Sequence, residues 1–261
     1  FSSIRYRLSL ESRLKAIKEA GFDSTMIWWG VEEFTRTGDK DIIPGMVRDN
    51  GLSLENIHVP FDRSNHLWSD DASIRENIVN DHLMWLEDCA RHQIPMMVMH
   101  ISRGKPKKNP GRNGIDSLIQ IIKTAEDIGV IVAVENARSE EYLDFVFSEI
   151  QSPNLRFCYD SSHDWIYSRE KTSVLRKHGH LMAAVHFADN DGMLDRHWLP
   201  GDGVIDWNLI SNAFPRDYSG VLSLEVAPSR KNRPSKAETF LAMAYEKAKW
   251  LDGLLSKHEN L

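Results

Sequence analysis

The sequence MMVMH at residues 96–100 is apolar at four consecutive positions and ends in a histidine. Two further runs, VIVAVE at 130–135 and VLSLEV at 221–226, are also mostly apolar and also contain an ionisable residue near their end. Runs that are apolar on both faces are typical of parallel strands covered on each side by helices. The sequence therefore predicts an α/β protein with a parallel sheet.

Shorter runs of the same kind recur along the chain and alternate with amphipathic segments. The predicted strands lie near residues 3–6, 24–29, 53–58, 95–100, 130–134, 155–159, 182–187 and 220–225. Eight strands that alternate with helices predict a (β/α)8 TIM barrel. A doubly wound open sheet is the alternative, but the glycine-rich phosphate loop expected after an early strand of that fold is absent from the sequence.

Four helices have recognisable ends. The segments 10–20 and 114–128 are each followed by a glycine, which favours the end of a helix. The segments 73–91 and 235–255 each open with Ser-x-x-Glu, which predicts a capping box that pairs the serine and the glutamate with backbone N–H groups.

Length and composition are those of an ordinary globular protein. The 261 residues suit one barrel, so we predict a single domain over residues 1–261. The chain has 32 basic and 38 acidic residues and a net charge of −6, which disfavours a nucleic-acid partner. Its two cysteines, Cys89 and Cys158, do not suggest a disulfide framework. No run approaches the ~20 apolar residues of a membrane span, and no charged leader with an apolar core opens the sequence, so a cytoplasmic location is expected.

Six of the predicted strands end in an ionisable residue. These strand-end residues are His58, His100, Glu135, Asp160, His186 and Glu225. In a parallel barrel all strands point the same way, so these side chains should converge on one mouth. Buried carboxylates and imidazoles are costly unless they are paired or bind metal, and a set of N and O ligands without thiolate suits Zn, Mn, Co or Mg. The sequence therefore predicts a divalent-metal site, although any one of these residues alone is more often a hydrogen-bonded core residue.

A second group of candidate ligands follows the strand ends. His163 comes three residues after Asp160, and Asp195 and His197 are two residues apart in the loop after the seventh predicted strand. These three residues are candidates for an additional metal or for substrate contacts, and His58 and His100 are candidates for the same roles. The alternative is that His163, Asp195 and His197 only order the loop.

Several motifs resemble those of the xylose isomerase-like TIM-barrel superfamily, which contains sugar isomerases and epimerases and also endonuclease IV. The motifs are HVPF (58–61), MHISRG (99–104), VENA (134–137), YDSSHDW (159–165), HFADNDGMLDRHWLPGDGVIDW (186–207) and LEV (224–226). The long motif is the most specific of them and is similar to the sugar phosphate isomerase/epimerase group.

This resemblance implies a ligand set and two catalytic residues. In the single-metal isomerases it implies that Glu135, Asp160, His186 and Glu225 bind the metal and that the two glutamates act as acid and base. In the endonuclease IV branch, the same four residues together with the second group and the strand-end histidines would hold three zinc ions. The net charge of −6 and the segment PFDRSNHLWSDD (60–71) favour the isomerase branch.

Three functions are therefore open. The favoured one is a divalent-metal-dependent isomerase or epimerase acting on a small sugar or sugar phosphate, with Glu135 and Glu225 moving a carbon-bound proton through an enediolate. The alternatives are an endonuclease IV-like multinuclear zinc phosphodiesterase and a non-catalytic metal- or sugar-binding barrel. A homo-oligomer is also expected.

Residues for substrate recognition are less clearly indicated. Arg196 is a candidate for an anionic substrate group, and Trp165 is one of several tryptophans near the predicted mouth that could contact a sugar face: Trp28, Trp29, Trp68, Trp165 and Trp198. Two basic clusters also follow predicted strands, Arg103, Lys105, Lys107 and Lys108 in one loop and Arg230, Lys231 and Arg233 in another. Either cluster could bind phosphate or carboxylate, but charged runs in loops are usually only solvated.

Overall fold

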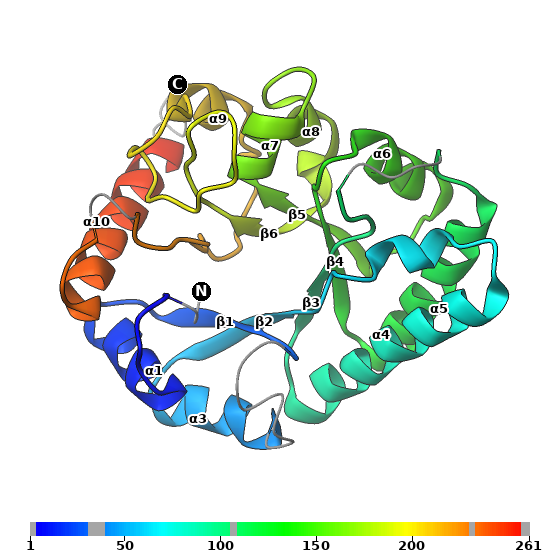
Figure 1. Ribbon diagram of the computed structural model, residues 1–261, viewed down its shortest axis with the longest axis horizontal. Helices are drawn as coiled ribbons and strands as arrows, with labels where there is room; N and C mark the ends of the chain where they lie inside the picture. The colour runs from blue at the N-terminus through cyan, green and yellow to red at the C-terminus, as the bar shows by residue number, and fades with distance from the viewer. Residues whose placement is uncertain (1–3, 31–39, 105–108, 230–232, 257–261) are drawn as a thin grey trace.

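The computed structural model describes residues 4–30, 40–104, 109–229 and 233–256. Its centre is a curled parallel sheet of six strands in the order β1-β2-β3-β4-β5-β6 (Figure 1). The strands are β1 (Ser24–Trp28), β2 (Ser53–His58), β3 (Met96–Met99), β4 (Ile131–Glu135), β5 (Leu155–Asp160) and β6 (Met182–His186). Each pairs with the next along the chain, so all six carboxyl ends lie at the same rim.

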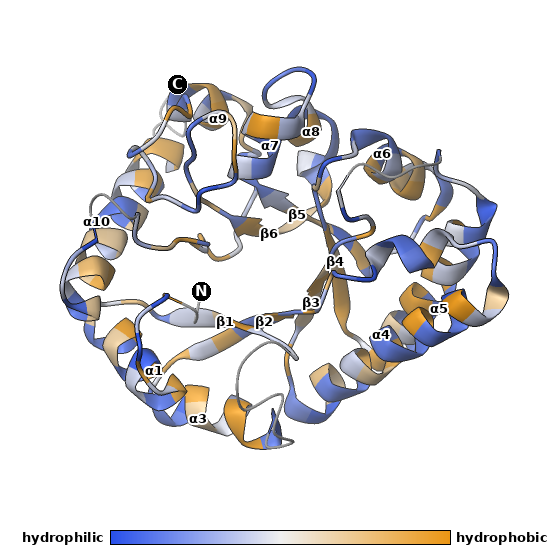
Figure 2. Cartoon of the chain, in the orientation of Figure 1, coloured by the Kyte–Doolittle hydropathy of each residue, from blue (hydrophilic) through white to orange (hydrophobic). Residues whose placement is uncertain are grey.

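Helices form a ring around this sheet (Figure 1). They are α1 (Leu10–Glu19), α3 (Ile43–Asp49), α4 (Ala72–His92), α5 (Arg112–Ile128), α6 (Glu140–Glu149), α7 (Ser161–Tyr167), α8 (Ser173–His178), α9 (Trp207–Ala213) and α10 (Ala237–Leu255). Figure 2 shows hydrophobic and hydrophilic positions interleaved along the helices, as expected when one helix face packs on a sheet. Within the described ranges, no helix is long and apolar enough to cross a membrane.

The predicted barrel architecture is confirmed, but two of the eight predicted strands are not regular. Over residues 4–6 the strand prediction is wrong, and residue 3 lies outside the described residues. Arg5 has φ +57°, a left-handed conformation that interrupts an extended strand. The segment predicted at 220–225 forms only an isolated parallel bridge between Leu224 and Phe187, with the Glu225 N–H donating to the Phe187 carbonyl at 3.1 Å.

The predicted capping boxes are also wrong. Helix α4 begins after Asp71, whose carboxylate accepts from the N–H groups of Ser73 (2.8 Å) and Ile74 (3.4 Å). Helix α10 begins after Lys236 without a side-chain cap. An aspartate is as good an N-cap as serine and lies two residues earlier, so it displaces Ser73 from that role. The predicted end of α5 at Gly129 is confirmed, with φ +72°.

The inside of the barrel holds a small apolar cluster directly beneath the mouth. This cluster consists of Met96, Val98, Ala133, Cys158 and Ala184. Side chains alternate between the two faces of a strand, so the inward position two residues further along each strand belongs to the mouth. Those positions are taken by His100, Glu135, Asp160 and His186. The strand period therefore places the ionisable residues directly above this apolar cluster.

Gly114 in the first turn of α5 allows a close approach by an aromatic ring. A Cβ at this position would lie 1.9 Å from Cε3 of Trp68. The Trp68 ring is held in place because its Nε1–H donates to the Ile101 carbonyl at 2.6 Å. We expect Gly114→Ala to reduce the free energy of unfolding by about 1–3 kcal/mol, the usual cost of overpacking, measured by urea denaturation.

A matched control for that variant is Gly45→Ala in α3. A Cβ added to this helical glycine would meet no heavy atom from elsewhere in the described residues within 4 Å. Alanine favours the helix by up to ~1 kcal/mol over glycine, so the control should be neutral or stabilising. Equal stability of the two variants would contradict the packing argument.

Candidate metal centre

Four buried ionisable side chains converge at the carboxyl ends of the strands. They are Glu135 at the end of β4, Asp160 at the end of β5, His186 at the end of β6 and Glu225 beside β6. Each offers one ligand atom, and the four atoms all lie within 4.8 Å of one another. A donor set of one imidazole nitrogen and three carboxylate oxygens suits a hard or borderline divalent cation.

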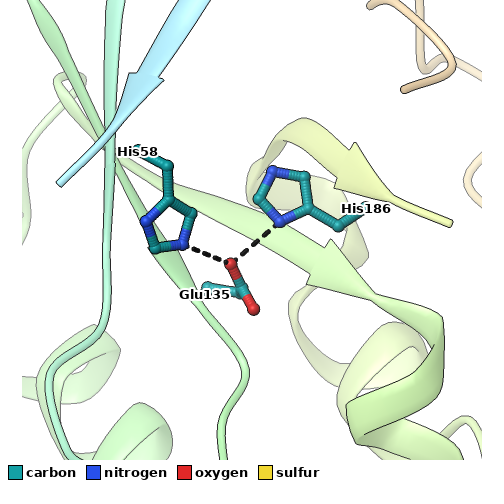
Figure 3. A group of neighbouring side chains, drawn as sticks. All are labelled: His58, Glu135 and His186. Carbon is teal, nitrogen blue, oxygen red and sulfur yellow. Dashed lines mark hydrogen bonds and ion pairs between the residues drawn. The ribbon is translucent and has the colours of Figure 1, made fainter. Parts of the chain in front are cut away.

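Glu135 is surrounded by imidazoles. Its Oε2 lies 3.2 Å from Nε2 of His58 and 2.9 Å from Nδ1 of His186 (Figure 3). Its Oε1 lies 3.2 Å from Nε2 of His100 and 3.0 Å from Nδ1 of His163. Burial raises the pKa of Glu135, but the charges of His100 and His186 and the hydrogen bonds outweigh it and hold the pKa well below its usual value. The carboxylate is therefore ionised at neutral pH.

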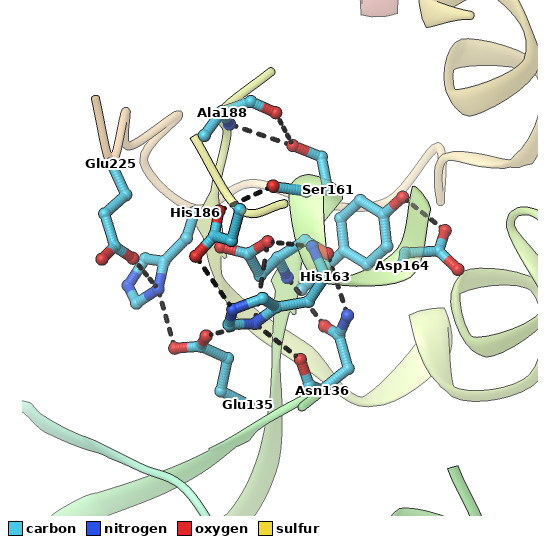
Figure 4. Close-up of polar contacts among 12 residues, drawn as sticks. Glu135, Asn136, Ser161, His163, Asp164, His186, Ala188 and Glu225 are labelled. Carbon is cyan, nitrogen blue, oxygen red and sulfur yellow. Dashed lines mark hydrogen bonds and ion pairs between the residues drawn. The ribbon is translucent and has the colours of Figure 1, made fainter. Parts of the chain in front are cut away.

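His186 links the two glutamates. Its Nδ1 lies 2.9 Å from Oε2 of Glu135 and 3.0 Å from Oε2 of Glu225 (Figure 4). Burial raises the pKa of Glu225, but the charge and hydrogen bond of His186 together with the charge of His197 outweigh it and lower the pKa to about 2. Two ionised carboxylates therefore reach one imidazole nitrogen from different parts of the barrel rim.

The two oxygens of Asp160 have separate roles. Oδ1 accepts from the His163 N–H at 2.6 Å and caps α7. Oδ2 is buried and has no hydrogen-bond partner among the described residues. Burial raises the pKa of Asp160 to about 7, because the ionised form is poorly solvated. A cation at this point would supply the missing partner, so the residues present fit a divalent metal.

The second group of candidate ligands lies at the edge of this cluster. Asp195 Oδ2 is 3.4 Å from Nε2 of His163 and 3.0 Å from Nε2 of His197. Burial lowers the pKa of His197, but its bond to Asp195 and the nearby carboxylates raise it to about 9. Asp195 therefore pairs with both histidines, and His163 also contacts Glu135. Among the described residues, the additional close group that could bind metal is His58 with Glu135 and His186.

The loop after β6 is held in shape by Asp189, which the sequence did not single out. This fully buried carboxylate accepts four hydrogen bonds, at 2.8–3.1 Å, from the N–H groups of Asn190, Gly201 and Ile205 and from Nε1 of Trp207. His197, in the same loop, adopts φ +53°, which the loop must hold against local preference. The shape of this loop therefore sets where Asp195 and His197 lie.

Replacement of Asp189 by asparagine should destabilise the loop. An amide nitrogen cannot accept, so two buried donors would lose their partner at about 1–3 kcal/mol each. We expect a lower free energy of unfolding, measured by urea denaturation. We also expect His197 to be held less firmly in its place. The control is Asp202→Asn in the same loop, where a half-exposed carboxylate lies 3.0 Å from Lys247 and should contribute about 0–1 kcal/mol. Similar losses in both variants would contradict the role of Asp189.

A cavity of about 430 Å³ opens above the cluster and is lined by both glutamates. One part of its wall is aromatic. Trp28 stacks on the His58 ring with centroids 4.2 Å apart, and Phe61 stacks on the His100 ring at 4.5 Å. Aromatic faces of this kind can pack against the C–H face of a sugar.

The two residues predicted for substrate contact, Arg196 and Trp165, do not line the cavity above the cluster. Arg196 donates from Nε to Asp191 at 2.7 Å and lines a separate cavity that shares Asp195 with the first. Trp165 is partly buried against the core and does not line the cavity above the cluster. Their predicted role receives no support from this placement and stays a prediction. Trp28 does line that cavity.

The other tryptophans and the basic residues named in the sequence analysis lie at separate places in the fold. Trp29 is buried and donates to Asp88 at 2.9 Å, away from the cavity. Arg103 lines the cavity, whereas Arg233 donates to the Arg5 carbonyl at 2.6 Å. The other members of the two basic clusters lie outside the described residues: Lys105, Lys107, Lys108, Arg230 and Lys231.

Comparison with known proteins places the chain in a family. The family model described as "Xylose isomerase-like TIM barrel" matches residues 14–247. The chain belongs to the xylose isomerase-like TIM barrel family. The superfamily that the sequence motifs indicated is thereby confirmed.

Three individual proteins that are similar to this chain share 26% sequence identity with it or less. Protein y4fM of Sinorhizobium fredii, described as uncharacterized, is 26% identical over 266 residues, which cover 86% of this chain and 83% of that protein. Fructoselysine 3-epimerase of Escherichia coli O157:H7 is 21% identical over 263 residues, which cover 90% of this chain and 91% of that protein. A D-psicose 3-epimerase crystal structure superposes with a TM-score of 0.73 at 16% identity, covering 96% of this chain and 95% of that one, and so shares its fold.

Proposed function

We propose that this protein is a divalent-metal-dependent sugar epimerase or isomerase that moves a carbon-bound proton of its substrate. The observation that carries the proposal is the pair of buried carboxylates, Glu135 and Glu225, that meet at Nδ1 of His186 and both line the cavity. Two carboxylates at one cavity can supply the groups that remove a carbon-bound proton and return it.

The metal would be held by Glu135, Asp160, His186 and Glu225. The unpartnered Oδ2 of Asp160 supports this assignment, as does the mutual proximity of the four ligand atoms. When bound, a divalent ion supplies Lewis acidity toward the oxygens of a sugar carbonyl and its neighbouring hydroxyl. The identity of the ion is left among Mn, Zn, Co and Mg, which all accept such N and O ligands.

The two glutamates would carry the proton. One carboxylate, in its ionised form, takes the proton from the carbon beside the carbonyl and leaves the substrate as an enediolate. If the other carboxylate takes up a proton from solvent and returns it to the opposite face of the same carbon, the product is an epimer. Return of a proton to the neighbouring carbon gives aldose–ketose isomerisation instead. The first carboxylate then releases its proton to solvent, so one proton leaves the substrate and one returns, and the cycle consumes no co-reactant.

The names of related proteins support a sugar substrate. The relative from Escherichia coli is a fructoselysine 3-epimerase, and the structural neighbours include a D-psicose 3-epimerase and an L-ribulose 3-epimerase. All three names describe inversion at carbon 3 of a keto sugar. We therefore place epimerisation of a keto sugar ahead of isomerisation for this chain.

The test is solvent-proton exchange. Purified protein is loaded separately with each of the four metals and incubated in D2O with a panel of keto sugars and their phosphates. Metal-dependent entry of deuterium at the carbon beside the carbonyl, seen by NMR, is the expected result. Three bound zinc ions per chain with cleavage of abasic DNA would favour the phosphodiesterase instead. Metal binding with no exchange in any sugar would favour the non-catalytic barrel.

Other predictions from the sequence concern the protein outside this site. The single domain over 1–261, the homo-oligomer and the cytoplasmic location stay predictions.

A further inference from the structure

Two arginines occupy equivalent positions on neighbouring loops at the cavity rim. Strands β3 and β4 pair in parallel with Met99 opposite Val134, which places His100 level with Glu135. Arg103 follows His100 by three residues, and Arg138 follows Glu135 by three residues. Both arginines line the cavity above the cluster. The strand register therefore brings the two arginines to neighbouring loops at the same cavity.

Local contacts hold each arginine at this cavity. Asn65 fixes the backbone of Arg103 from both sides, accepting from its N–H at 3.0 Å and donating to its carbonyl at 2.9 Å. The guanidinium of Arg138 stacks over the Tyr167 ring, 4.6 Å from the centroid, and Tyr167 itself lines the cavity. Stacking on an aromatic face orders the guanidinium while its N–H groups stay available at the edge.

Neither arginine is neutralised strongly by the protein. Arg103 pairs with Asp62 at 3.1 Å, but both side chains are more than half exposed, and a pair of that kind contributes little. Within the described ranges, no carboxylate lies at ion-pair distance from Arg138. A ligand anion could therefore displace Asp62 and reach both guanidinium groups without separating a buried ion pair.

The geometry points to an anion subsite: Arg103 and Arg138 bind a phosphate or carboxylate group on the substrate, while its keto-sugar part lies over the acidic cluster. This inference rests on the proposed function for the position of the sugar and deepens it by naming the substrate class. The aromatic residues Trp28 and Phe61 belong to the β1 and β2 ends, next to the β3 and β4 ends that carry the arginines. A sugar stacked on that wall could extend its anionic end toward the two arginines.

The experiment compares probes that differ only in the anionic group. The protein loaded with Mn²⁺ is titrated calorimetrically with D-fructose, D-fructose 6-phosphate, D-fructuronate and inorganic phosphate. At least one anionic sugar is expected to bind about tenfold or more tightly than D-fructose, since hydrogen bonds to charged groups are the stronger ones. A comparison of D-fructose 6-phosphate with D-fructuronate shows whether the subsite prefers phosphate or carboxylate. Binding should weaken as salt is raised, because both arginines are exposed.

Arg103→Ala and Arg138→Ala should each lower the affinity for the preferred anionic probe about tenfold. The affinity for D-fructose should stay within about twofold. The matched control is Arg169→Ala, an exposed arginine that pairs with Glu141 and does not line the cavity. Arg138→Lys should recover only part of the affinity, because an ammonium cannot bind in a bidentate way. Equal affinity for neutral and anionic sugars would overturn the subsite, as would anion binding that survives both alanine substitutions.

These outcomes are separable from the proposed function. If neutral sugars exchange deuterium but the arginine substitutions change nothing, the epimerase proposal stands and the anion subsite fails. If anionic sugars bind through the arginines but no sugar exchanges deuterium, the subsite stands and the epimerase proposal fails.

Discussion

The Glu135→Gln variant is expected to exchange solvent deuterium into substrate about 10³-fold or more slowly than the unmodified protein. Its carboxylate would both take part in proton transfer and bind the metal, and general acid–base catalysis alone contributes about 10²–10⁴-fold. Glutamine keeps the size of the side chain but cannot accept a proton at neutral pH. Glu225→Gln should have a similar effect, because Glu225 also contacts Nδ1 of His186 and lines the same cavity.

Metal content separates the two causes of such a loss. Each glutamine variant is analysed for bound metal by mass spectrometry and for exchange over a range of metal concentrations. Activity that returns at high metal would assign the loss to binding, and activity that stays absent in the loaded variant would assign it to proton transfer. Glu141→Gln, an exposed residue paired with Arg169, is the matched control and should behave as the unmodified protein. Full turnover in either Glu135→Gln or Glu225→Gln would refute the two-base scheme.

The Asp160→Asn variant is expected to bind metal far more weakly, with little change in the fold. Asparagine can keep its Oδ1 in place to accept from the His163 N–H, so the cap of α7 survives. Its amide nitrogen would replace Oδ2, the buried oxygen without a partner among the described residues, and cannot serve as a ligand. Substitutions next to a ligand set usually cost about 10–100-fold in metal affinity. The loss of metal affinity in Asp160→Asn should be larger.

Thermal unfolding with and without metal measures this loss. Metal at 100 times its dissociation constant stabilises a folded protein by about 2.7 kcal/mol, so a chelator should lower the melting temperature of the unmodified protein. The chelator should have no effect on Asp160→Asn. Without metal, the variant should melt at or above the temperature of the unmodified protein, because it no longer buries a carboxyl whose pKa is raised to about 7. A chelator response equal in both proteins would show that Asp160 is not a ligand.

The sequence was sufficient to locate the inner cluster. Glu135, Asp160 and His186 each end a predicted strand that the structure confirms. Their convergence follows from one physical fact, that parallel strands in a barrel direct all their carboxyl ends to one rim. Strand position and direction were therefore enough, and no knowledge of individual contacts was needed.

The same reasoning was insufficient where local conformation departs from the regular pattern. The left-handed Arg5 removes a predicted strand, and Asp71 replaces Ser73 as the cap of α4. Both outcomes depend on small differences between competing local conformations that tertiary packing resolves. Asp189 is a similar case, because its four hydrogen-bond donors are up to 18 residues away along the chain.

The strand ends in the sequence determined by themselves that a cluster of imidazoles and carboxylates would form at the barrel mouth. Only the tertiary structure decided how its atoms are used. It directed both glutamates to Nδ1 of His186, left Oδ2 of Asp160 without a partner among the described residues, and put Arg103 and Arg138 at the same cavity. It also drew Arg196 into a pair with Asp191. The physical reason is that the alternation of strands and helices along the chain indicates where parallel strands end, whereas these contacts depend on loop shape and side-chain rotamers across the whole barrel.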